Sequence, residues 1–369
     1  MKPVYFLIPL LLFLALIAYS LMRGYQTLGD IKPLKITYLV VYILLVVAFF
    51  AGMVCPFLAG VPGTKLIAFV GHTALVIIIY LVLSYFLTDI VRLANRFIHF
   101  APDLLLRKYC LSGSIIVIIT ALIIGNWRFQ HPEIVHLDIH LPQQTALTHP
   151  IKMVIISDLH LGISIDKDRL QEYVALINAQ HPDIVCIVGD IYDNKYAPVV
   201  DQKMHEEWLQ IKAPLGVYTV LGNHDYYEGN LEEKIHYLQQ GGITVLKDDI
   251  TLIDSTFYLL GRDDRSNKNR NDLATIMQGR EVSKPVFVLD HQPYNLEEAK
   301  TNKVDVQFSG HTHGGQFFPM TLIVNSMYKK SYGYLRLGDT QYYITSGLGL
   351  WGPQYRIGSS SELVVATIR

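Results

Sequence analysis

The sequence has few cysteines and almost no net charge, and both shortages exclude classes of protein. Only three cysteines occur in 369 residues, and Cys55, Cys110 and Cys186 are far apart. This spacing provides neither a disulfide framework nor a zinc knuckle built from thiolates. The formal net charge is −1, so bulk electrostatics do not favour a nucleic-acid partner. The sequence also shows no internal repeat or low-complexity segment.

Charge is scarcest in the N-terminal third, which holds four long apolar runs at residues 3–22, 36–57, 66–87 and 109–127. Each run is long enough to cross a hydrocarbon core of about 30 Å as a helix. We therefore predict a four-helix transmembrane region at residues 1–127. A cleaved signal peptide is the alternative for the first run, because Ala18-Tyr19-Ser20 resembles a cleavage site. The only ionisable residue well inside a run is His72, which we interpret as hydrogen-bonded within the helix bundle rather than as a proton relay.

Lysine and arginine are distributed unevenly among the loops that join these runs. The loops after the first and third runs hold seven such residues: Arg23, Lys32, Lys35, Arg92, Arg96, Arg107 and Lys108. The N-terminal tail and the second loop hold one each, Lys2 and Lys65. Basic loops tend to remain in the cytoplasm. We therefore expect a multi-pass protein of the cell membrane, embedded in the lipid bilayer, with residues 128–369 on the extracytoplasmic side.

In residues 128–369, strand patterns alternate with helix patterns, as in an α/β domain. Strands are expected at residues 135–139, 153–157, 183–188, 216–221, 256–260, 285–290, 304–309, 341–345 and 363–368. Helical spacing appears between the early strands, for example at Leu170, Tyr173, Val174 and Ile177. Another helix is expected from Asn230, with Glu233 completing a capping box, to Gly241. Fewer helices separate the later strands, which favours a second, mixed sheet.

Seven candidate metal ligands stand directly after these strands: Asp158, His160, Asp190, Asn223, His291, His311 and His313. The carboxyl ends of strands in an open α/β sheet converge on one crevice, so the side chains should meet there. The two side chains of Asp158-Leu-His160 are expected on one side of an extended turn. Carboxylate, imidazole and amide oxygen suit borderline and hard divalent ions. Seven ligands are more than one ion needs, and one shared carboxylate would give each of two ions four bonds, which predicts a two-metal hydrolase.

The order of these motifs resembles the calcineurin-like metallophosphoesterase superfamily, whose pattern is Asp-x-His, Gly-Asp, Gly-Asn-His-Asp/Glu, His and Gly-His-x-His. The resemblance covers about residues 150–369. The segments GHTHGGQ and SGLGLWGPQYRIGSSSEL are similar to the bacterial membrane-associated branch of phosphoesterases and phosphodiesterases. The resemblance implies an αββα sandwich, two mixed β-sheets flanked by helices, that hydrolyses phosphoesters or phosphodiesters. A substrate linked to a lipid or to the cell envelope would suit the transmembrane region.

The resemblance also implies a role for each motif residue. The first metal would be held by Asp158, His160, Asp190 and His313, and the second by Asp190, Asn223, His291 and His311. A hydroxide bridging the two ions would attack phosphorus. His224 would protonate the leaving oxygen, and Asp225 would orient its imidazole. Manganese, zinc, iron and nickel all tolerate these ligands. Asp193 stands where purple acid phosphatases have a tyrosine, with Tyr192 one position before, which argues against a tyrosine-bound ferric ion.

Other hypotheses stay open. The domain could be a catalytically inactive, metal-binding sensory or regulatory module, or the regulator of a transporter. Asp193, Arg262, Asp263 and Asp264 are interpreted as solvated loop charges, although they could line a substrate mouth. Arg356 could bind a phosphate or pair with a carboxylate. Trp351 and Tyr355 could pack under a loop or meet a membrane interface.

Overall fold

The computed structural model describes residues 4–54, 61–145, 147–280 and 283–369. Lys2, Cys55 and the ends of the first two predicted spans, residues 3 and 55–57, lie outside the described residues. The chain divides into two compact units, Met1–Ile124 and Gly125–Arg369. We describe each unit by itself.

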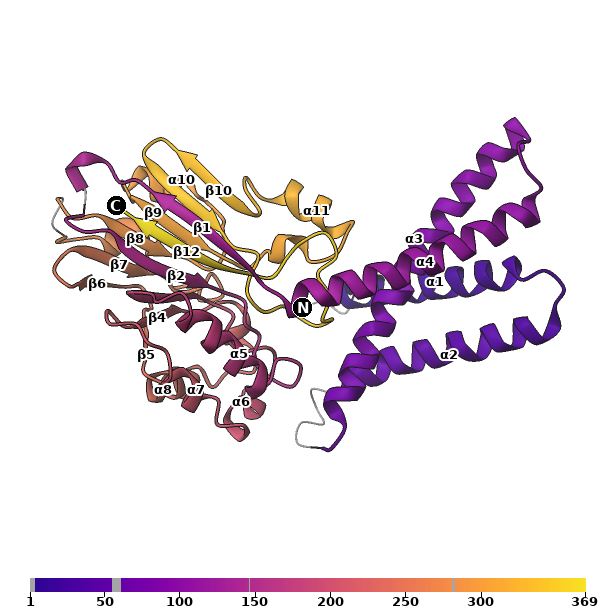
Figure 1. Cartoon of the computed structure of the whole chain (residues 1–369), viewed down its shortest axis with the longest axis horizontal. Helices are drawn as coiled ribbons and strands as arrows, with labels where there is room; N and C mark the ends of the chain where they lie inside the picture. The colour runs from indigo at the N-terminus through magenta and orange to yellow at the C-terminus, as the bar shows by residue number, and fades with distance from the viewer. Residues whose placement is uncertain (1–3, 55–60, 146, 281–282) are drawn as a thin grey trace. The chain divides into compact units, whose positions relative to one another are not determined.

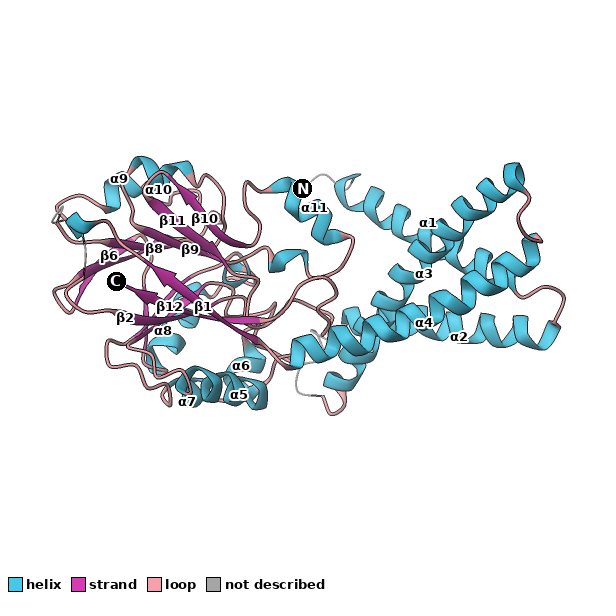
Figure 2. Ribbon diagram, turned by 45° about the horizontal axis from the view of Figure 1, so that its top comes forward, coloured by secondary structure: helices cyan, strands magenta, loops and turns pink. Residues whose placement is uncertain are grey.

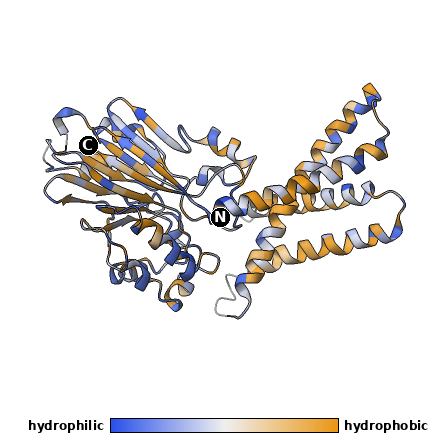
Figure 3. Cartoon of the chain, in the orientation of Figure 1, coloured by the Kyte–Doolittle hydropathy of each residue, from blue (hydrophilic) through white to orange (hydrophobic). Residues whose placement is uncertain are grey.

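The first unit is built from long apolar helices, which appear almost wholly orange in Figure 3. They are α1 (Val4–Thr27), α2 (Lys32–Val54), α3 (Thr64–Ile98) and α4 (Asp103–Gln130). Among the described residues, these four helices are long and apolar enough to cross a membrane, which confirms the predicted spans. Gly52 of α2 and Gly71 of α3 face each other so closely that a Cβ atom on either would collide with the other backbone. Small residues allow this approach between membrane helices. His72 was expected to be hydrogen-bonded within the bundle, and its Nδ1 atom is buried without a hydrogen-bond partner among the described residues.

The second unit consists of two six-stranded mixed sheets with helices on their outer faces (Figure 1; Figure 2). The first sheet has the order β1-β12-β2-β3-β4-β5 and the second β10-β11-β9-β8-β7-β6. The first sheet contains β1 (Glu133–Ile139), β2 (Ile151–Ile156), β3 (Ile184–Val188), β4 (Val217–Val220), β5 (Ile243–Val245) and β12 (Glu362–Ile368). The second contains β6 (Asp249–Ile253), β7 (Phe257–Gly261), β8 (Val286–Leu289), β9 (Val306–Ser309), β10 (Gly333–Leu337) and β11 (Thr340–Ile344).

Helices cover the outer face of each sheet. The first sheet carries α5 (Lys167–Asn178), α6 (Ala197–Asp201), α7 (His205–Trp208) and α8 (Leu231–Gln240), and the second carries α9 (Leu273–Ile276) and α10 (Glu297–Thr301) (Figure 2). The remaining helix, α11 (Met320–Met327), follows the GHTHGGQ motif. Short 3₁₀ turns occur at Gln143–Thr145, His224–Tyr226 and His313–Gly315.

Strand β2 shows why the sheets stack in this way. Met153 and Ile155 belong to the core between the two sheets, whereas Val154 and Ile156 belong to the core beneath the helices. Successive side chains of a strand point to opposite faces, so an uninterrupted apolar strand must be covered on both sides. The layers are therefore helix, sheet, sheet and helix, which confirms the predicted αββα sandwich.

The start of α8 differs from the predicted capping box. Asn230 adopts a left-handed backbone conformation with φ 53°, and its side chain makes no cap hydrogen bond. A capping side chain needs an extended backbone at this position to reach the amides of the first turn. The predicted end is right, because α8 stops at Gln240 and Gly241 is its C-cap.

The second unit begins three residues before the boundary expected from the sequence, because the end of α4 packs into it. Phe129 is 1% exposed and lies in the core beneath α5. Arg169 of α5 lies over the Phe129 ring, 4.9 Å from its centroid, and donates to the Phe129 carbonyl at 2.6 Å. Arg356 also donates its backbone N–H to the Gly125 carbonyl at 2.8 Å.

We expect the chain from Gly125 onward to fold without the preceding residues, and Phe129→Ala to destabilise it. Removing a buried phenylalanine ring costs about 3–5 kcal/mol of unfolding free energy. Denaturant unfolding of this shortened chain measures the loss. Trp127→Ala is the matched control, because Trp127 is 59% exposed. Equal stability of the two variants would show that the end of α4 is not part of the folded unit.

Candidate metal centre

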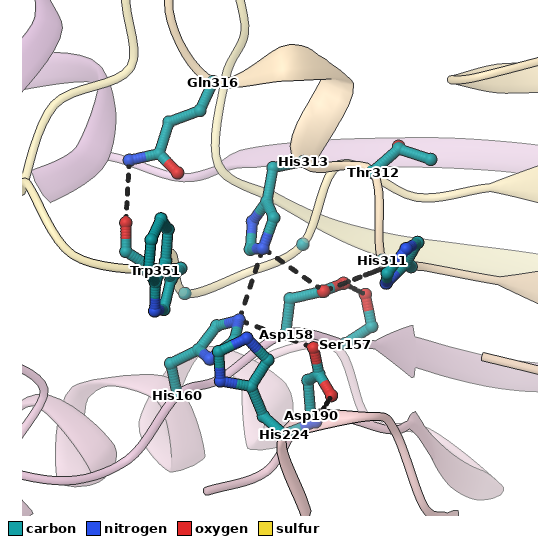
Figure 4. A network of polar contacts seen from close by, with 12 residues as sticks. Ser157, Asp158, His160, Asp190, His224, His311, Thr312, His313, Gln316 and Trp351 are labelled. Atoms are coloured by element: carbon teal, nitrogen blue, oxygen red, sulfur yellow. Dashed lines mark hydrogen bonds and ion pairs between the residues drawn. The ribbon is translucent and has the colours of Figure 1, made fainter. Parts of the chain in front are cut away.

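The seven predicted ligands all lie in turns that follow carboxyl ends of strands. In the first sheet, Asp158 and His160 follow β2, Asp190 follows β3 and Asn223 follows β4. In the second sheet, His291 follows β8, and His311 and His313 follow β9. Six residues of this site are seen together in Figure 4: Asp158, His160, Asp190, His224, His311 and His313. The paired sheets therefore bring together side chains that are up to 155 positions apart, from Asp158 to His313.

Three overlapping groups of side chains each place their candidate ligand atoms within 4.8 Å of one another. The groups are Asp158, His160 and His313; His160, Asp190 and His224; and Asp190, His291 and His311. Asp190 and His160 each occur in two groups. Asp190 Oδ2 lies 3.2 Å from His291 Nε2 and 3.8 Å from His160 Nε2. The second and third groups therefore meet at Asp190, the residue predicted to bridge, and the first and second groups meet at His160.

The donor atoms at this site fit a divalent cation. Asn223 Nδ2 donates to the Tyr227 hydroxyl at 3.4 Å, and Asn223 Oδ1 has no hydrogen-bond partner in the described part of the chain. A buried amide oxygen without a partner is costly unless something absent from the protein pairs with it. His291 Nδ1 lies 2.7 Å from the Val188 carbonyl, which can only accept, so neutral His291 has its lone pair on Nε2, toward Asp190.

The electrostatics of the site also favour a bound cation. Although burial opposes a charged imidazole, the Asp190 carboxylate raises the pKa of His291 well above its usual range. Burial lowers the pKa of His160 and of His313 well below the usual range, so both rings are neutral and keep a lone pair for a metal. Their Nε2 atoms are 3.3 Å apart. The centre combines anionic oxygen with neutral imidazole, as divalent metals require.

The backbone at the ligands is strained, which the sequence did not indicate. Left-handed φ values occur at Asp158 (55°), His160 (48°), Asp190 (52°), His311 (73°) and His313 (51°). The expectation of an extended Asp158–His160 turn was therefore wrong. Non-glycine residues in this region cost about 1–2 kcal/mol each and cluster at functional sites. Close packing adds to this constraint, because a Cβ atom on Gly222 would collide with the Asp190 carboxylate.

His224 lies beside the ligands, but its ring is not oriented by Asp225 as predicted. The His224 backbone N–H donates to Asp190 Oδ1 at 2.8 Å, and His224 Nδ1 lies 3.1 Å from the Asp193 carbonyl oxygen. This carbonyl fixes the Nδ1 proton, so a backbone atom performs the task assigned to Asp225. No sequence pattern identifies a carbonyl oxygen as a partner.

The Asp225 carboxylate instead ties two turns of the site together. Its oxygens accept four backbone N–H groups, from Asp190, Ile191, Tyr192 and Gly222, at 2.7–3.0 Å. Asp225 is fully buried. Its contacts hold the Asp190 turn against the turn that leads to Asn223, so Asp225 positions ligands and the prediction that it contacts the His224 ring was wrong.

Arg262, Asp263 and Asp264 are buried rather than solvated, which corrects the expectation of solvated loop charges. Arg262 pairs with Asp290 at 3.4 Å and with Glu298 at 2.9 Å. Asp264 accepts two hydrogen bonds from Gln292, at 2.8 and 3.0 Å. Asp263 accepts a short hydrogen bond from the Tyr226 hydroxyl. Since Asp290 and Gln292 flank His291, this cluster supports the turn that carries the ligand. Asp193 lies at the site itself, where burial raises the pKa of its carboxyl to about 7.

Arg356 makes no ion pair with a carboxylate among the described residues, and its guanidinium is too deeply buried to meet a phosphate, so both alternatives for it were wrong. Its guanidinium is fully buried and donates to four backbone carbonyls, those of His313, Ser346, Gly347 and Gly349. Arg356 therefore holds the His313 turn against the C-terminal loop. Tyr192 donates its hydroxyl to the Lys234 carbonyl at 3.0 Å, in keeping with the argument against a tyrosine ligand.

The family model for calcineurin-like phosphoesterases matches residues 151–315. A transmembrane protein with a metallophosphoesterase domain from Danio rerio is 31% identical over 249 residues, which cover 63% of this chain and 56% of that protein. An uncharacterized metallophosphoesterase of Campylobacter jejuni is 30% identical over 276 residues, which cover 72% of this chain and 71% of that protein. An uncharacterized metallophosphoesterase of Bacillus subtilis is 28% identical over 258 residues, which cover 66% of this chain and 89% of that protein.

Proposed function

Since the chain belongs to the calcineurin-like phosphoesterase family, we propose that it hydrolyses phosphoesters with two divalent metal ions that share Asp190. The observation that carries this proposal is the overlap of the ligand groups at the Asp190 carboxylate. Its Oδ2 atom lies within 4 Å of both His160 Nε2 and His291 Nε2, at 3.8 and 3.2 Å. A shared carboxylate between two ions is the usual design of two-metal hydrolases.

The proposed ligand sets extend the first group by Asp190 and the third group by Asn223. Asp158, His160, Asp190 and His313 would hold the first ion, and Asp190, Asn223, His291 and His311 the second. Manganese, zinc, iron and nickel all suit such ligands. When bound, the two cations lower the pKa of a water molecule and neutralise charge that develops on the phosphoryl oxygens.

His224 is the proposed proton donor to the leaving oxygen. Its backbone is fixed by Asp190 and its Nδ1 by the Asp193 carbonyl, so Nε2 remains for the substrate. The His224 ring meets the His160 ring edge-on, with centroids 4.6 Å apart. A donor this close to the ligands can reach the oxygen that departs as phosphorus is attacked.

The substrate class is proposed from the first unit. Four candidate spans are more than an anchor needs. The additional spans favour a substrate whose phosphoester or phosphodiester is carried by a lipid or by the cell envelope. The whole chain would then act on substrates at the bilayer surface, where a soluble enzyme would meet them slowly.

Hydrolysis of a simple aryl phosphodiester by the purified full-length protein tests this function. After chelation, activity should be absent, and it should return when a divalent metal is added. An aryl phosphomonoester in parallel shows which ester class is preferred. Metal bound without any turnover of either ester would favour the inactive sensory module instead.

We also propose that the second unit lies outside the cytoplasm. The seven basic residues of the first and third loops support this orientation. Arg23 and Arg92 pair with Asp89, but acidic residues have little influence on orientation, so both arginines still favour the cytoplasmic side.

Labelling of Asn269→Cys on intact cells measures the orientation. Asn269 is exposed in the loop before α9. A membrane-impermeant thiol reagent is expected to label this variant without lysis. The same substitution at Lys32, the exposed first residue of α2, is the control and should be labelled only after lysis. The reverse pattern would place the metal centre in the cytoplasm.

A further inference from the structure

Exposed apolar side chains gather at one edge of the second unit, next to the metal centre. We name this set the α11 rim, and it consists of Phe318, Met320, Leu322, Ile323, Met327 and Trp351. Each of these side chains is 45–62% exposed. Soluble surfaces seldom expose so many large apolar groups together, and such patches mark sites of interaction.

The α11 rim is held rigidly by the loops of the metal centre. The buried Thr321 packs against Gly315, in the turn that begins with the ligand His313, and against Gly358 in the C-terminal loop. Gln316 donates its amide to the carbonyls of Trp351 and Pro353, at 3.1 and 3.0 Å. With Thr321 facing inward, the larger apolar side chains of α11 face outward.

The rim also reaches the proposed proton donor. The Trp351 ring lies 6.1 Å from the His224 ring, measured between centroids. Figure 4 shows the Trp351 indole beside His160 and His224. Whatever binds the rim therefore lies at the entrance to the metal centre.

The same edge of the unit receives the end of α4, which is the last candidate span. Phe318 N–H donates to the Ile357 carbonyl, and Ile357 N–H donates to the Gln316 carbonyl at 2.9 Å. One residue earlier, Arg356 N–H donates to the Gly125 carbonyl, and Asn126 donates to the Gln354 carbonyl at 3.0 Å. Only His131 and Pro132 separate α4 from β1. The α11 rim is therefore linked, within this unit, to the residues by which the chain leaves the bilayer.

The positions of the tryptophans also favour contact between this edge and a lipid bilayer. Of the three tryptophans, Trp208 is buried, whereas Trp127 and Trp351 are exposed and lie one and three residues along the chain from Asn126 and Gln354, which contact each other. Tryptophan is enriched where a protein meets the headgroup layer of a bilayer. Lys330, three residues after α11, is suited to anionic headgroups, as is its neighbour Lys329, which is half exposed although it pairs with Glu297.

We propose that the α11 rim inserts into the headgroup and upper acyl region of the phospholipid bilayer, so that the metal centre opens at the membrane surface. An apolar helix face that lies in the interface is buried about 5–10 Å below the headgroups. Under the proposed function, on which this consequence rests, the scissile phosphoester belongs to a membrane lipid whose acyl chains remain in the bilayer beside the rim.

Fluorescence quenching by lipid tests the docking surface directly. The full-length protein carries Leu322→Cys with an NBD label, in a background with Cys55→Ser and Cys110→Ser, and is reconstituted in phosphatidylcholine and phosphatidylglycerol vesicles. Spin-labelled phosphatidylcholine is expected to quench this label. Leu209→Cys is the matched control, since Leu209 is 61% exposed at the end of α7, and its label should not be quenched. If the spin-labelled lipid quenches the label at Leu322 no more than the label at Leu209, the proposal is overturned.

A matched pair of esters then tests the consequence for the substrate. Hexadecyl and methyl nitrophenyl phosphate contain the same reacting group, but only the first is held in vesicles. The double variant Leu322→Glu/Ile323→Glu should hydrolyse the hexadecyl ester about tenfold or more slowly than wild type, because the rim no longer enters the apolar layer. It should hydrolyse the methyl ester as wild type does, which also shows that it is folded. Leu209→Glu should change neither rate.

The two proposals fail separately in these experiments. Unchanged hydrolysis of both esters by the double variant would overturn the docking surface. If wild type hydrolyses neither ester, the proposed function is wrong, while the quenching result still decides whether the α11 rim meets the bilayer.

Discussion

Replacing Asp190 by Asn is expected to reduce kcat/KM for an aryl phosphodiester by on the order of 10³-fold or more. Removing one group that stabilises the transition state typically costs about 10²–10³-fold, and Asp190 belongs to two ligand groups at once. The amide keeps the size of the side chain and can still accept from the His224 N–H. The loss should therefore come from the missing negative charge between the two ions. Metal content should fall together with activity.

Asp201→Asn is the control for this experiment, because Asp201 is exposed at the end of α6 and belongs to none of the three ligand groups. It should retain wild-type activity and metal content. An Asp190→Asn protein that stays within about tenfold of wild type, less than the loss of one stabilising group, would show that Asp190 is not shared between metals.

His224→Ala should lower turnover by about 10²–10⁴-fold while both metals remain bound. The loss should be larger for an alkyl leaving group than for nitrophenolate, which needs little protonation. Because His224 also belongs to a group with His160 and Asp190, its metal content must be measured together with its rate. Loss of one metal would make His224 a ligand, and equal losses for both leaving groups would exclude the proton-donor role.

His236→Ala provides the matched control. His236 is an exposed histidine of α8 that bonds only to Gln240 among the described residues, at 3.1 Å. Its replacement should alter neither metal content nor the ratio of rates for the two leaving groups.

The central strands were predictable from sequence because they are buried on both faces. Strands β3 and β8 are uninterrupted apolar runs, and each was expected within one or two residues of its observed ends. Strands β5, β6 and β10 were not predicted. They are three of the four edge strands of the two sheets, and β5 has only three residues; the fourth edge strand, β1, was predicted. Edge strands are covered less completely, so the mixed pattern of β10 lacks the apolar run that marks a central strand.

The candidate site was predictable only where side chains carry the information. The motif order identified the side chains that meet at Asp190, since each ends a strand of a paired sheet. The contacts that hold these ligands could not be predicted from sequence, because their partners are main-chain atoms. Asp225 accepts hydrogen bonds from backbone N–H groups, and Arg356 donates to backbone carbonyls. Burial of Arg262 could not be inferred either, since its two carboxylate partners come from distant segments, at Asp290 and Glu298.

Metal stoichiometry tests the central claim most directly. The chelated full-length protein would be titrated with manganese or zinc while bound metal and phosphodiester hydrolysis are measured on the same samples. Shared ligation by Asp190 predicts two bound ions per chain, activity that appears only as the second ion binds, and one ion lost in Asp158→Asn. Activity that survives exhaustive chelation, or that is complete with one ion per chain, would contradict the two-metal centre.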